Sequence, residues 1–155
     1  MTQAVRRPVI AVLNGPNLNL LGERDPKAYG TVTLAEIEKD CLEAADRLGF
    51  DVDFRQTNHE GVLIDAVHEL RHSAAGVVIN PAALTHTSVG VRDALAVVAG
   101  PVIEVHLSNV HRREAFRHHS FVNEVADGII TGCGERGYVM AIEHVAHLVS
   151  EDADR

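Results

Sequence analysis

The sequence predicts an α/β fold in which a doubly wound, five-stranded parallel sheet is covered by helices on both faces. Short β-branched runs alternate with segments of helical period along the whole chain, which is the pattern of such sheets. The chain has 155 residues, of which 46% are hydrophobic and 23% charged, so it fits one domain with a full core. We expect this domain to span 1–155, with flexible tails at 1–8 and 150–155.

Each element has its own signal in the sequence. Runs rich in Val and Ile predict strands at 9–13, 52–56, 77–80, 102–106 and 128–131. The first helix begins with the capping box Thr33-Leu34-Ala35-Glu36 and stops at Gly49. Further helices are expected near 61–72, 88–98, 112–116 and 137–149. Right-handed crossovers give the strand order 2-1-3-4-5, a flavodoxin-like topology.

Composition and charge argue against several classes of function. The formal net charge is −8 without an evident basic face, which argues against a nucleic-acid partner. The longest apolar run, Ala94 to Ala99, has six residues, whereas a membrane span needs about 20. The apolar run at 9–13 is too short for a secretory signal, so we expect a cytoplasmic protein without membrane partners. Two cysteines are too few for a disulfide framework.

Polar residues follow four of the predicted strands. The strands run into Asn14-Gly15-Pro16-Asn17, Thr57-Asn58-His59-Glu60, Asn80-Pro81 and His106-Leu107-Ser108-Asn109. Ligands of doubly wound sheets bind outside the carboxyl ends of the strands. The sequence therefore predicts a binding site at this edge of the sheet.

The connection at 18–31 has the length and the glycine and proline content of an active-site lid. It carries Tyr29, five residues after Arg24. A guanidinium near a phenol favours the phenolate, which is a general base. The alternative for Tyr29 is a loop tyrosine that packs its ring on the sheet.

A second candidate group lies at the end of the fourth strand. Glu104 and His106 are two residues apart, so their side chains leave the same face and the carboxylate can keep the imidazole protonated as a general acid. The alternative is a structural histidine. Ser108, Arg113 and Arg117 follow, and their hydroxyl and guanidinium groups suit a carboxylate ligand. An acid, a base and anion-binding groups, without a metal or redox cofactor, suit elimination of water next to a carbonyl.

Two sequence motifs resemble other kinds of site. His68-Glu69-Leu70-Arg71-His72 matches the HExxH zinc pattern, but the helical period turns both histidines away from the apolar stripe, which favours a solvated helix face. Gly132-Cys133-Gly134-Glu135-Arg136-Gly137 matches a dinucleotide fingerprint. It belongs to the last βα unit, where no strand remains to complete such a fold, so we interpret it as a tight glycine turn.

Several ordered motifs resemble the type II 3-dehydroquinate dehydratases over about residues 9–148. They are Asn14-Gly15-Pro16-Asn17-Leu18-Asn19-Leu20-Leu21-Gly22, Arg24 with Tyr29-Gly30, Arg55-Gln56-Thr57-Asn58-His59-Glu60-Gly61, Asn80-Pro81-Ala82-Ala83-Leu84-Thr85-His86-Thr87-Ser88, Glu104-Val105-His106-Leu107-Ser108-Asn109, Arg113-Glu114-Ala115-Phe116-Arg117 and Gly132-Cys133-Gly134-Glu135-Arg136-Gly137-Tyr138. The resemblance implies a hydro-lyase that converts 3-dehydroquinate to 3-dehydroshikimate in the shikimate pathway of aromatic amino-acid biosynthesis. It implies an anti elimination through an enolate, with no cofactor and no metal.

The resemblance also implies roles for individual residues. Tyr29 matches the base, Arg24 the residue that favours its phenolate, His106 the acid with Glu104 as its partner, and Asn17 the residue that holds a water against the enolate. Substrate-binding positions are matched by Asn80, His86, Leu107, Ser108, Arg113 and Arg117. Asp93 matches an aspartate that reaches into a neighbouring subunit's site, and the implied assembly is a homododecamer, a tetramer of trimers.

Three other interpretations remain open at this point. A receiver on the same fold needs carboxylates at its strand ends, where this chain has Asn14 and Asn80. A flavin-binding module favours aromatic stacking, whereas aromatic residues make up 4% of the chain and tryptophan is absent. A Schiff-base dehydratase needs a lysine in the pocket, and the two lysines, Lys27 and Lys39, fall in the lid and in the capped helix.

Overall fold

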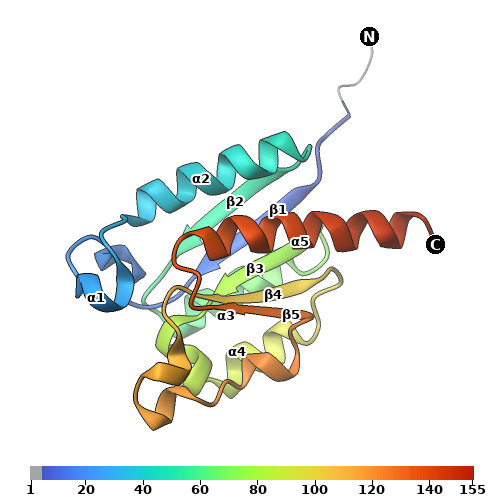
Figure 1. Ribbon diagram of the computed structural model, residues 1–155. Helices are drawn as coiled ribbons and strands as arrows, with labels where there is room; N and C mark the ends of the chain where they lie inside the picture. The colour runs from blue at the N-terminus through green and yellow to red at the C-terminus, as the bar shows by residue number, and fades with distance from the viewer. Residues whose placement is uncertain (1–4) are drawn as a thin grey trace.

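The computed structural model describes residues 5–155. Within that range the strands form one parallel, five-stranded sheet in the order β2-β1-β3-β4-β5, which confirms the predicted topology (Figure 1). The strands are β1 (Val9–Asn14), β2 (Asp51–Gln56), β3 (Gly76–Asn80), β4 (Val102–His106) and β5 (Gly128–Thr131). Each lies within one residue of its predicted bounds.

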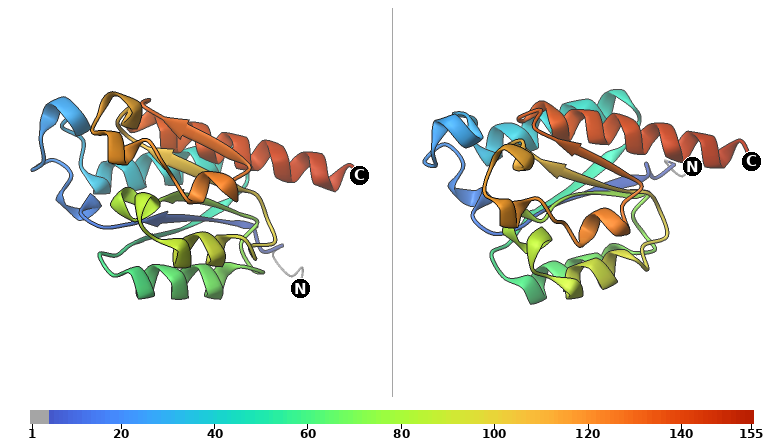
Figure 2. Two further views of the ribbon diagram at one scale, coloured as in Figure 1. Left: turned by 90° about the horizontal axis from the view of Figure 1, so that it is seen from below. Right: turned by 60° about the horizontal axis from the view of Figure 1, so that its bottom comes forward.

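Helices cover both faces of the sheet, as Figure 2 shows from two directions. One face carries α2 (Leu34–Arg47) and α5 (Arg136–Ala153), which contact each other. The other carries α3 (Glu60–Leu70) and α4 (Val89–Leu95). All residues of β3 and β4 are buried, as is expected for a parallel sheet with both faces covered.

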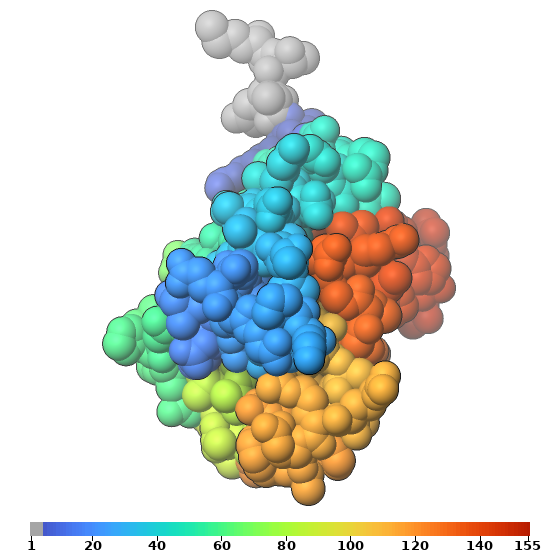
Figure 3. Space-filling view, turned by 60° about the vertical axis from the view of Figure 1, so that its left-hand side comes forward, coloured from blue at the N-terminus to red at the C-terminus, as the bar shows by residue number. Residues whose placement is uncertain are grey.

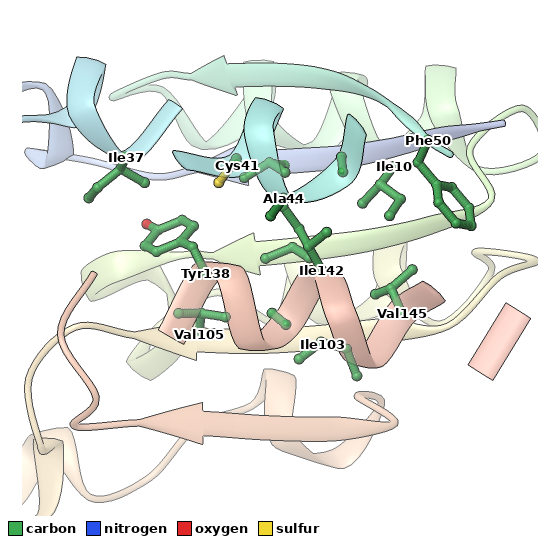
Figure 4. Packing of buried hydrophobic residues seen from close by; sticks show 14 of the residues in the cluster. Ile10, Ile37, Cys41, Ala44, Phe50, Ile103, Val105, Tyr138, Ile142 and Val145 are labelled. Carbon is green, nitrogen blue, oxygen red and sulfur yellow. The ribbon is translucent and has the colours of Figure 1, made fainter. Parts of the chain in front are cut away.

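The core consists of two apolar layers, one on each side of the sheet. Under α2 and α5, fully buried side chains such as Ile10, Ile37 and Ile142 pack together (Figure 4). Under α3 and α4, Leu63 and Val91 belong to the second layer. Full burial of one such side chain contributes about 1.5–3 kcal/mol, so both layers hold the sheet as a rigid platform.

The predicted capping box of α2 is confirmed. The Thr33 hydroxyl accepts from the Glu36 backbone N–H at 3.2 Å, and the Glu36 carboxylate accepts from the Thr33 N–H at 2.7 Å. Hydrogen bonds from the Thr33 backbone N–H and the Thr33 hydroxyl to the Glu36 carboxylate lower the pKa of Glu36. Gly49 follows the helix with φ +84°, a conformation that favours glycine.

Other element ends differ from prediction because tertiary contacts set them. α4 ends at Leu95 instead of near 98, because the chain must turn to bring Gly100 against Ala75. The approach is so close that a Cβ on Gly100 would lie 2.3 Å from the Ala75 carbonyl oxygen. α5 continues to Ala153, where the pattern predicts a tail from 150. The Ser150 hydroxyl donates to the Ala146 carbonyl in this last part of the helix.

The structure describes part of the predicted N-terminal tail. The Arg7 guanidinium donates to the Phe50 carbonyl at 2.8 Å, and the Pro8 carbonyl accepts from Asp51 at 2.9 Å. Residues 7 and 8 are therefore joined to the start of β2. The remainder of that prediction, at 1–4, lies outside the described residues.

Short helical turns occupy the connections that follow the strands. The lid contains η1 (Leu18–Leu20) and α1 (Pro26–Tyr29), and η2 (Ala82–His86) follows β3. The helix predicted at 112–116 is wrong: two 3-10 turns, η3 (Val110–Arg112) and η4 (Ala115–Arg117), stand there, and η5 (Val122–Glu124) follows. From residue 5 to residue 155, no helix has the length and apolarity to cross a membrane.

Candidate active site

A cavity of about 130 Å³ lies at the carboxyl ends of the strands, enclosed by the lid and by the segments that follow β1, β3 and β4. Figure 3 shows the lid segment in blue beside the orange segment that contains η3 and η4. All four residues predicted to be catalytic line the cavity, and so do the predicted substrate-binding residues except Asp93. The predicted residues in its wall are Asn17, Arg24, Tyr29, Asn80, His86, His106, Leu107, Ser108, Arg113 and Arg117.

The lid brings Arg24 and Tyr29 together as predicted. Asp25 caps the single turn of α1 by accepting from the Lys27 N–H at 3.0 Å, and Gly30 leaves it with φ +71°. Arg24 precedes this turn and Tyr29 is its last residue, and the Arg24 guanidinium donates to the Tyr29 hydroxyl oxygen at 2.8 Å. The Tyr29 ring also packs against the edge of the core, so its carbon skeleton is supported while its oxygen meets the arginine.

The Glu104 and His106 side chains meet at the end of β4. The Glu104 carboxylate lies 2.7 Å from His106 Nε2, and both residues are buried. This contact leaves Nδ1 as the ring nitrogen free to serve the cavity. Burial opposes ionisation of Glu104, but hydrogen bonds and the His106 charge outweigh it, so the pKa of Glu104 is lowered overall.

His86 faces His106 from η2, with ring centroids 6.4 Å apart. Its Nδ1–H donates to the His119 carbonyl at 2.7 Å, so Nε2 carries the lone pair. Burial is the main cause of its lowered pKa, and the charges of His106 and Arg117 act in the same direction. His86 is therefore suited to accept a hydrogen bond as a neutral imidazole.

A buried amide and phenol network fixes the ends of β1 and β3. The Tyr138 hydroxyl donates to Asn14 Oδ1 at 2.7 Å and accepts from Asn80 Nδ2 at 2.9 Å. The Ala82 N–H donates to Asn80 Oδ1 at 3.1 Å, which sets the orientation of the amide. Burial raises the pKa of Tyr138 well above its ordinary value, so this tyrosine remains a neutral donor.

Gly15 and Asn17 shape the turn that follows β1. A Cβ on Gly15 would lie 2.4 Å from the Pro81 carbonyl oxygen, so only glycine fits between the two strand ends. Asn17 has φ 69°, and its backbone N–H donates to the Asn58 side chain at 2.9 Å. The asparagine is thereby held at the wall of the cavity in a left-handed conformation that this residue type tolerates.

The cavity wall is strongly cationic although the chain is acidic overall. Arg24, Arg113 and Arg117 all line it. The Arg113 guanidinium lies 5.2 Å from the Tyr29 ring centroid and donates to the Ser108 hydroxyl at 3.2 Å. Convergent guanidinium groups beside a hydroxyl suit a small ligand that carries a carboxylate.

Asp93 and both lysines lie elsewhere. Asp93 is exposed on α4, outside the cavity, and pairs with Arg92 at 2.9 Å. Lys27 lines a neighbouring groove, and Lys39 on α2 lies 3.9 Å from Glu43. Neither lysine lines the cavity, so the geometry for a Schiff base with its ligand is not formed.

The HExxH and GxGxxG motifs do not form the sites that they resemble. α3 ends at Leu70, so His72 lies beyond the helix, and Glu69 pairs with Arg55 at 2.8 Å. No group of three or more potential metal-ligating His, Cys, Asp or Glu side chains occurs within residues 5–155. Gly132 and Gly134 have φ +84° and +61°, as the prediction of a tight turn requires.

Some neighbours of these residues were not predicted as part of the site. Thr85 and Ser120 both contact the Glu104 carboxylate, Tyr138 holds Asn80, and Asn58 holds Asn17. Thr85 and Tyr138 stand inside motifs of the family resemblance, which is a usable signal. Ser120 follows two histidines in a loop, and no periodicity or motif marks it.

Comparison with known proteins agrees with this geometry. The family model described as Dehydroquinase class II matches residues 8–146. The 3-dehydroquinate dehydratase 2 of Pseudomonas aeruginosa is 63% identical over 137 residues, 88% of this chain and 93% of the relative. The 3-dehydroquinate dehydratase of Streptomyces coelicolor is 53% identical over 156 residues, 100% of this chain and 99% of the relative.

Solved structures give the same result. The crystal structure of type II dehydroquinase from Butyrivibrio crossotus has a TM-score of 0.87 at 43% identity, covering 90% of this chain and 97% of that one. The type II dehydroquinase from Propionibacterium acnes has a TM-score of 0.84 at 43% identity, covering 90% and 96%. The fold and site define a hydro-lyase with a flavodoxin-like sheet. The chain belongs to the class II dehydroquinases, which are type II 3-dehydroquinate dehydratases.

Proposed function

We propose that this chain removes water from 3-dehydroquinate to give 3-dehydroshikimate by the joint action of Tyr29 and His106. The substrate is a ketone with a hydroxyl on the carbon β to the carbonyl. The α carbon loses a proton, an enolate forms, and the β hydroxyl then leaves as water while a carbon–carbon double bond forms. Such a reaction needs one base and one acid.

Tyr29 is the proposed base. Its oxygen accepts from Arg24 at 2.8 Å, and the guanidinium stabilises negative charge on that oxygen. As phenolate it takes the α proton and becomes phenol. To complete the cycle, a proton must leave Tyr29 and His106 must regain the proton that it gives to the departing hydroxyl. The position of Tyr29 on the lid gives its proton a path to solvent when the lid opens.

His106 is the proposed acid. Its Nε2 lies 2.7 Å from the buried Glu104 carboxylate, which favours the imidazolium. The Nδ1 proton passes to the departing hydroxyl, which leaves as water. The observation that carries the proposal is that the Arg24–Tyr29 and Glu104–His106 pairs line or adjoin one cavity of about 130 Å³.

The remaining residues are proposed to bind the substrate and the enolate. Ser108 and the arginines of the cavity wall suit the carboxylate of the substrate. Neutral His86 suits a hydroxyl of the substrate ring, which would donate a hydrogen bond to it. Asn17 is proposed to hold a water that donates to the enolate oxygen. The expected stereochemistry is anti, with base and acid acting on opposite faces of the ring.

The same proposal includes an assembly and a cellular role. Asp93, which is exposed and lies outside the cavity of its own chain, is proposed to act in a neighbouring subunit of a homododecamer. Val89 and Val97, near the two ends of α4, are 50% and 56% exposed, which suits a contact between subunits. Light scattering on the purified chain measures the number of subunits. The role would be cytoplasmic, in aromatic amino-acid biosynthesis.

A direct assay tests the reaction. Protein stripped with a chelator is mixed with 3-dehydroquinate, and ultraviolet absorbance follows the conjugated enone of the product. We expect the absorbance to rise at a rate proportional to enzyme concentration. A flat trace from protein that circular dichroism shows to be folded would overturn the proposal.

A further inference from the structure

The Glu104 carboxylate has more hydrogen-bond donors than His106 alone. It is fully buried and accepts from the Thr85 hydroxyl at 2.5 Å through Oε1. The Ser120 hydroxyl lies 2.9 Å from Oε1 and 3.1 Å from Oε2. These two side chains, Thr85 and Ser120, are called the hydroxyl pair below.

The surroundings of Ser120 decide where its proton points. Its oxygen accepts from the backbone N–H groups of Val122 and Asn123, each at 3.1 Å. Both lone pairs of that oxygen are therefore engaged, and the Ser120 O–H must act as a donor. The partners within reach are Glu104 and Thr85, whose oxygen lies 2.6 Å away.

The same constraint passes to Thr85. Since the Ser120 oxygen is saturated as an acceptor, the Thr85 O–H donates to Glu104. The hydroxyl pair thus directs its protons toward one buried carboxyl group. Hydrogen bonds to an ionised acceptor are roughly twice as strong as those to a neutral one, so this arrangement favours the carboxylate.

A proton on His106 needs this support because, apart from the proposed Tyr29 phenolate, the other groups around it are cationic or neutral. Arg117 from η4 lines the cavity with it, as do Arg24 and Arg113, and neutral His86 faces it from η2. A second, smaller cavity behind the ring is lined by His111 and His118 in addition to Glu104. Tyr29, the proposed base, lies across the main cavity.

We propose that Thr85 and Ser120 are positioning residues that hold Glu104 ionised and fixed. The proton that Glu104 and His106 share then resides on His106. The proposal rests on the proposed function of His106 as the acid. The hydroxyl pair lines the smaller cavity and not the main one, so it acts through Glu104 and not on the substrate. Without the hydroxyl pair, this proton shifts from His106 to Glu104, and both groups become neutral.

The test compares variants that remove a hydroxyl with variants that keep it. Thr85→Val is nearly isosteric and removes the hydroxyl, whereas Thr85→Ser keeps it. Ser120→Ala and Ser120→Thr form the second pair. Ser150→Ala, which removes a hydroxyl far from the site on α5, is the control. Thermal denaturation of every variant reports on folding.

We expect kcat to fall by about tenfold in Thr85→Val and Ser120→Ala, which is the effect of one lost hydrogen bond to a charged group. KM should change by less than the kcat effect, and Thr85→Ser and Ser120→Thr should restore kcat. The loss of kcat should appear as a lower plateau of the pH profile and not as a shift along the pH axis. The reason is that a proton moving from His106 to Glu104 leaves the number of protons bound by these two residues unchanged.

Nitrogen NMR of His106 supplies a readout that a merely structural role would not move. We expect both ring nitrogens to be protonated in the parent protein at neutral pH and the ring to become neutral in the hydroxyl-deleted variants. Unchanged kcat in folded Ser120→Ala, or an unchanged His106 spectrum, would overturn the inference. If the parent protein itself fails to turn over substrate, the proposed function fails, while the NMR comparison still tests the hydroxyl pair.

Discussion

The lid and the ends of the central strands face each other across one cavity, yet they are built in opposite ways. The lid has the 3-10 turn η1 and one turn of α-helix, α1, in which no residue is buried. Its proposed base, Tyr29, is held by one hydrogen bond from Arg24 and by packing of its ring on the edge of the core. At the strand ends, Glu104 and His106 are buried and tied to neighbouring segments. We therefore expect the proposed base to move with the lid and the proposed acid to stay fixed to the sheet.

This difference shows how one small domain combines access with precision. Folding supplies the energy that buries and orients the acid, because its partners are part of the core. We expect the part of the lid around α1 to open at little cost because no residue of α1 is buried, whereas Leu18 and Leu21 at the start of the lid are buried in the core and should stay in place. We expect the substrate to enter on the lid side without disturbing the proposed acid.

The largest expected effect comes from removing the two reacting groups. Tyr29→Phe takes away the proposed base, and His106→Asn takes away the proposed acid while retaining polarity. We expect each to lower kcat by about 10² to 10⁴-fold, the usual contribution of general acid–base catalysis. Steady-state kinetics with the enone assay measures the loss, and isothermal calorimetry measures whether substrate still binds. Turnover near that of the parent protein would refute the role of the residue concerned.

The lid and the strand ends can be compared directly with one substitution, Tyr to Phe, because the chain has one tyrosine in each region, Tyr29 on the lid and Tyr138 at the strand ends. Tyr138→Phe removes a fully buried hydroxyl that serves Asn14 and Asn80, so we expect a loss of about 1–3 kcal/mol in the free energy of unfolding. Tyr29→Phe on the lid should change stability by less than about 0.5 kcal/mol. Urea unfolding of both variants measures this.

The outcome separates a fixed side from a mobile one. The expected pattern is a large kcat loss without a stability loss for Tyr29→Phe, and a stability loss with a smaller kcat effect for Tyr138→Phe. Equal stability losses would mean that the lid is as firmly integrated into the fold as the strand ends are.

The sequence predicts the strands and their order well because each strand is a run of β-branched residues between clear turn signals. The same analysis misjudges the end of α4, because the close approach of Gly100 to Ala75 is a tertiary requirement. It also misses the turns at η2 and η5, whose short 3-10 geometry leaves no periodicity to detect.

The predicted site residues divide in the same manner. Arg24 and Tyr29, or Glu104 and His106, are close in sequence, so local spacing predicts their pairing, and the structure brings each pair together. Ser120 reaches Glu104 only because the connection between β4 and β5 folds back to β4, which a single sequence does not reveal. The role of Asp93 concerns a second chain and stays a prediction.

The smallest expected effect is a change in how stability depends on pH. Hydrogen bonds and the His106 charge keep the pKa of Glu104 below its ordinary value in the folded chain, although burial opposes ionisation. A carboxyl with a lowered folded-state pKa stabilises the fold above its unfolded value, about 4.3, and loses this contribution as pH falls through the folded value. The parent protein should therefore lose its advantage over Glu104→Gln on acidification.

Thermal denaturation of the two proteins from neutral pH down to a pH below the unfolded value of about 4.3 measures this advantage. Asp53 and Glu69, whose pKa values are lowered by hydrogen bonds from Arg55, contribute equally to both proteins and cancel in the difference. We expect the difference in Tm to be largest near neutrality and to shrink as pH falls. A difference that stays constant with pH would mean that the carboxyl is not stabilised as an anion, and the acid side of the cavity would then be no better fixed than the lid.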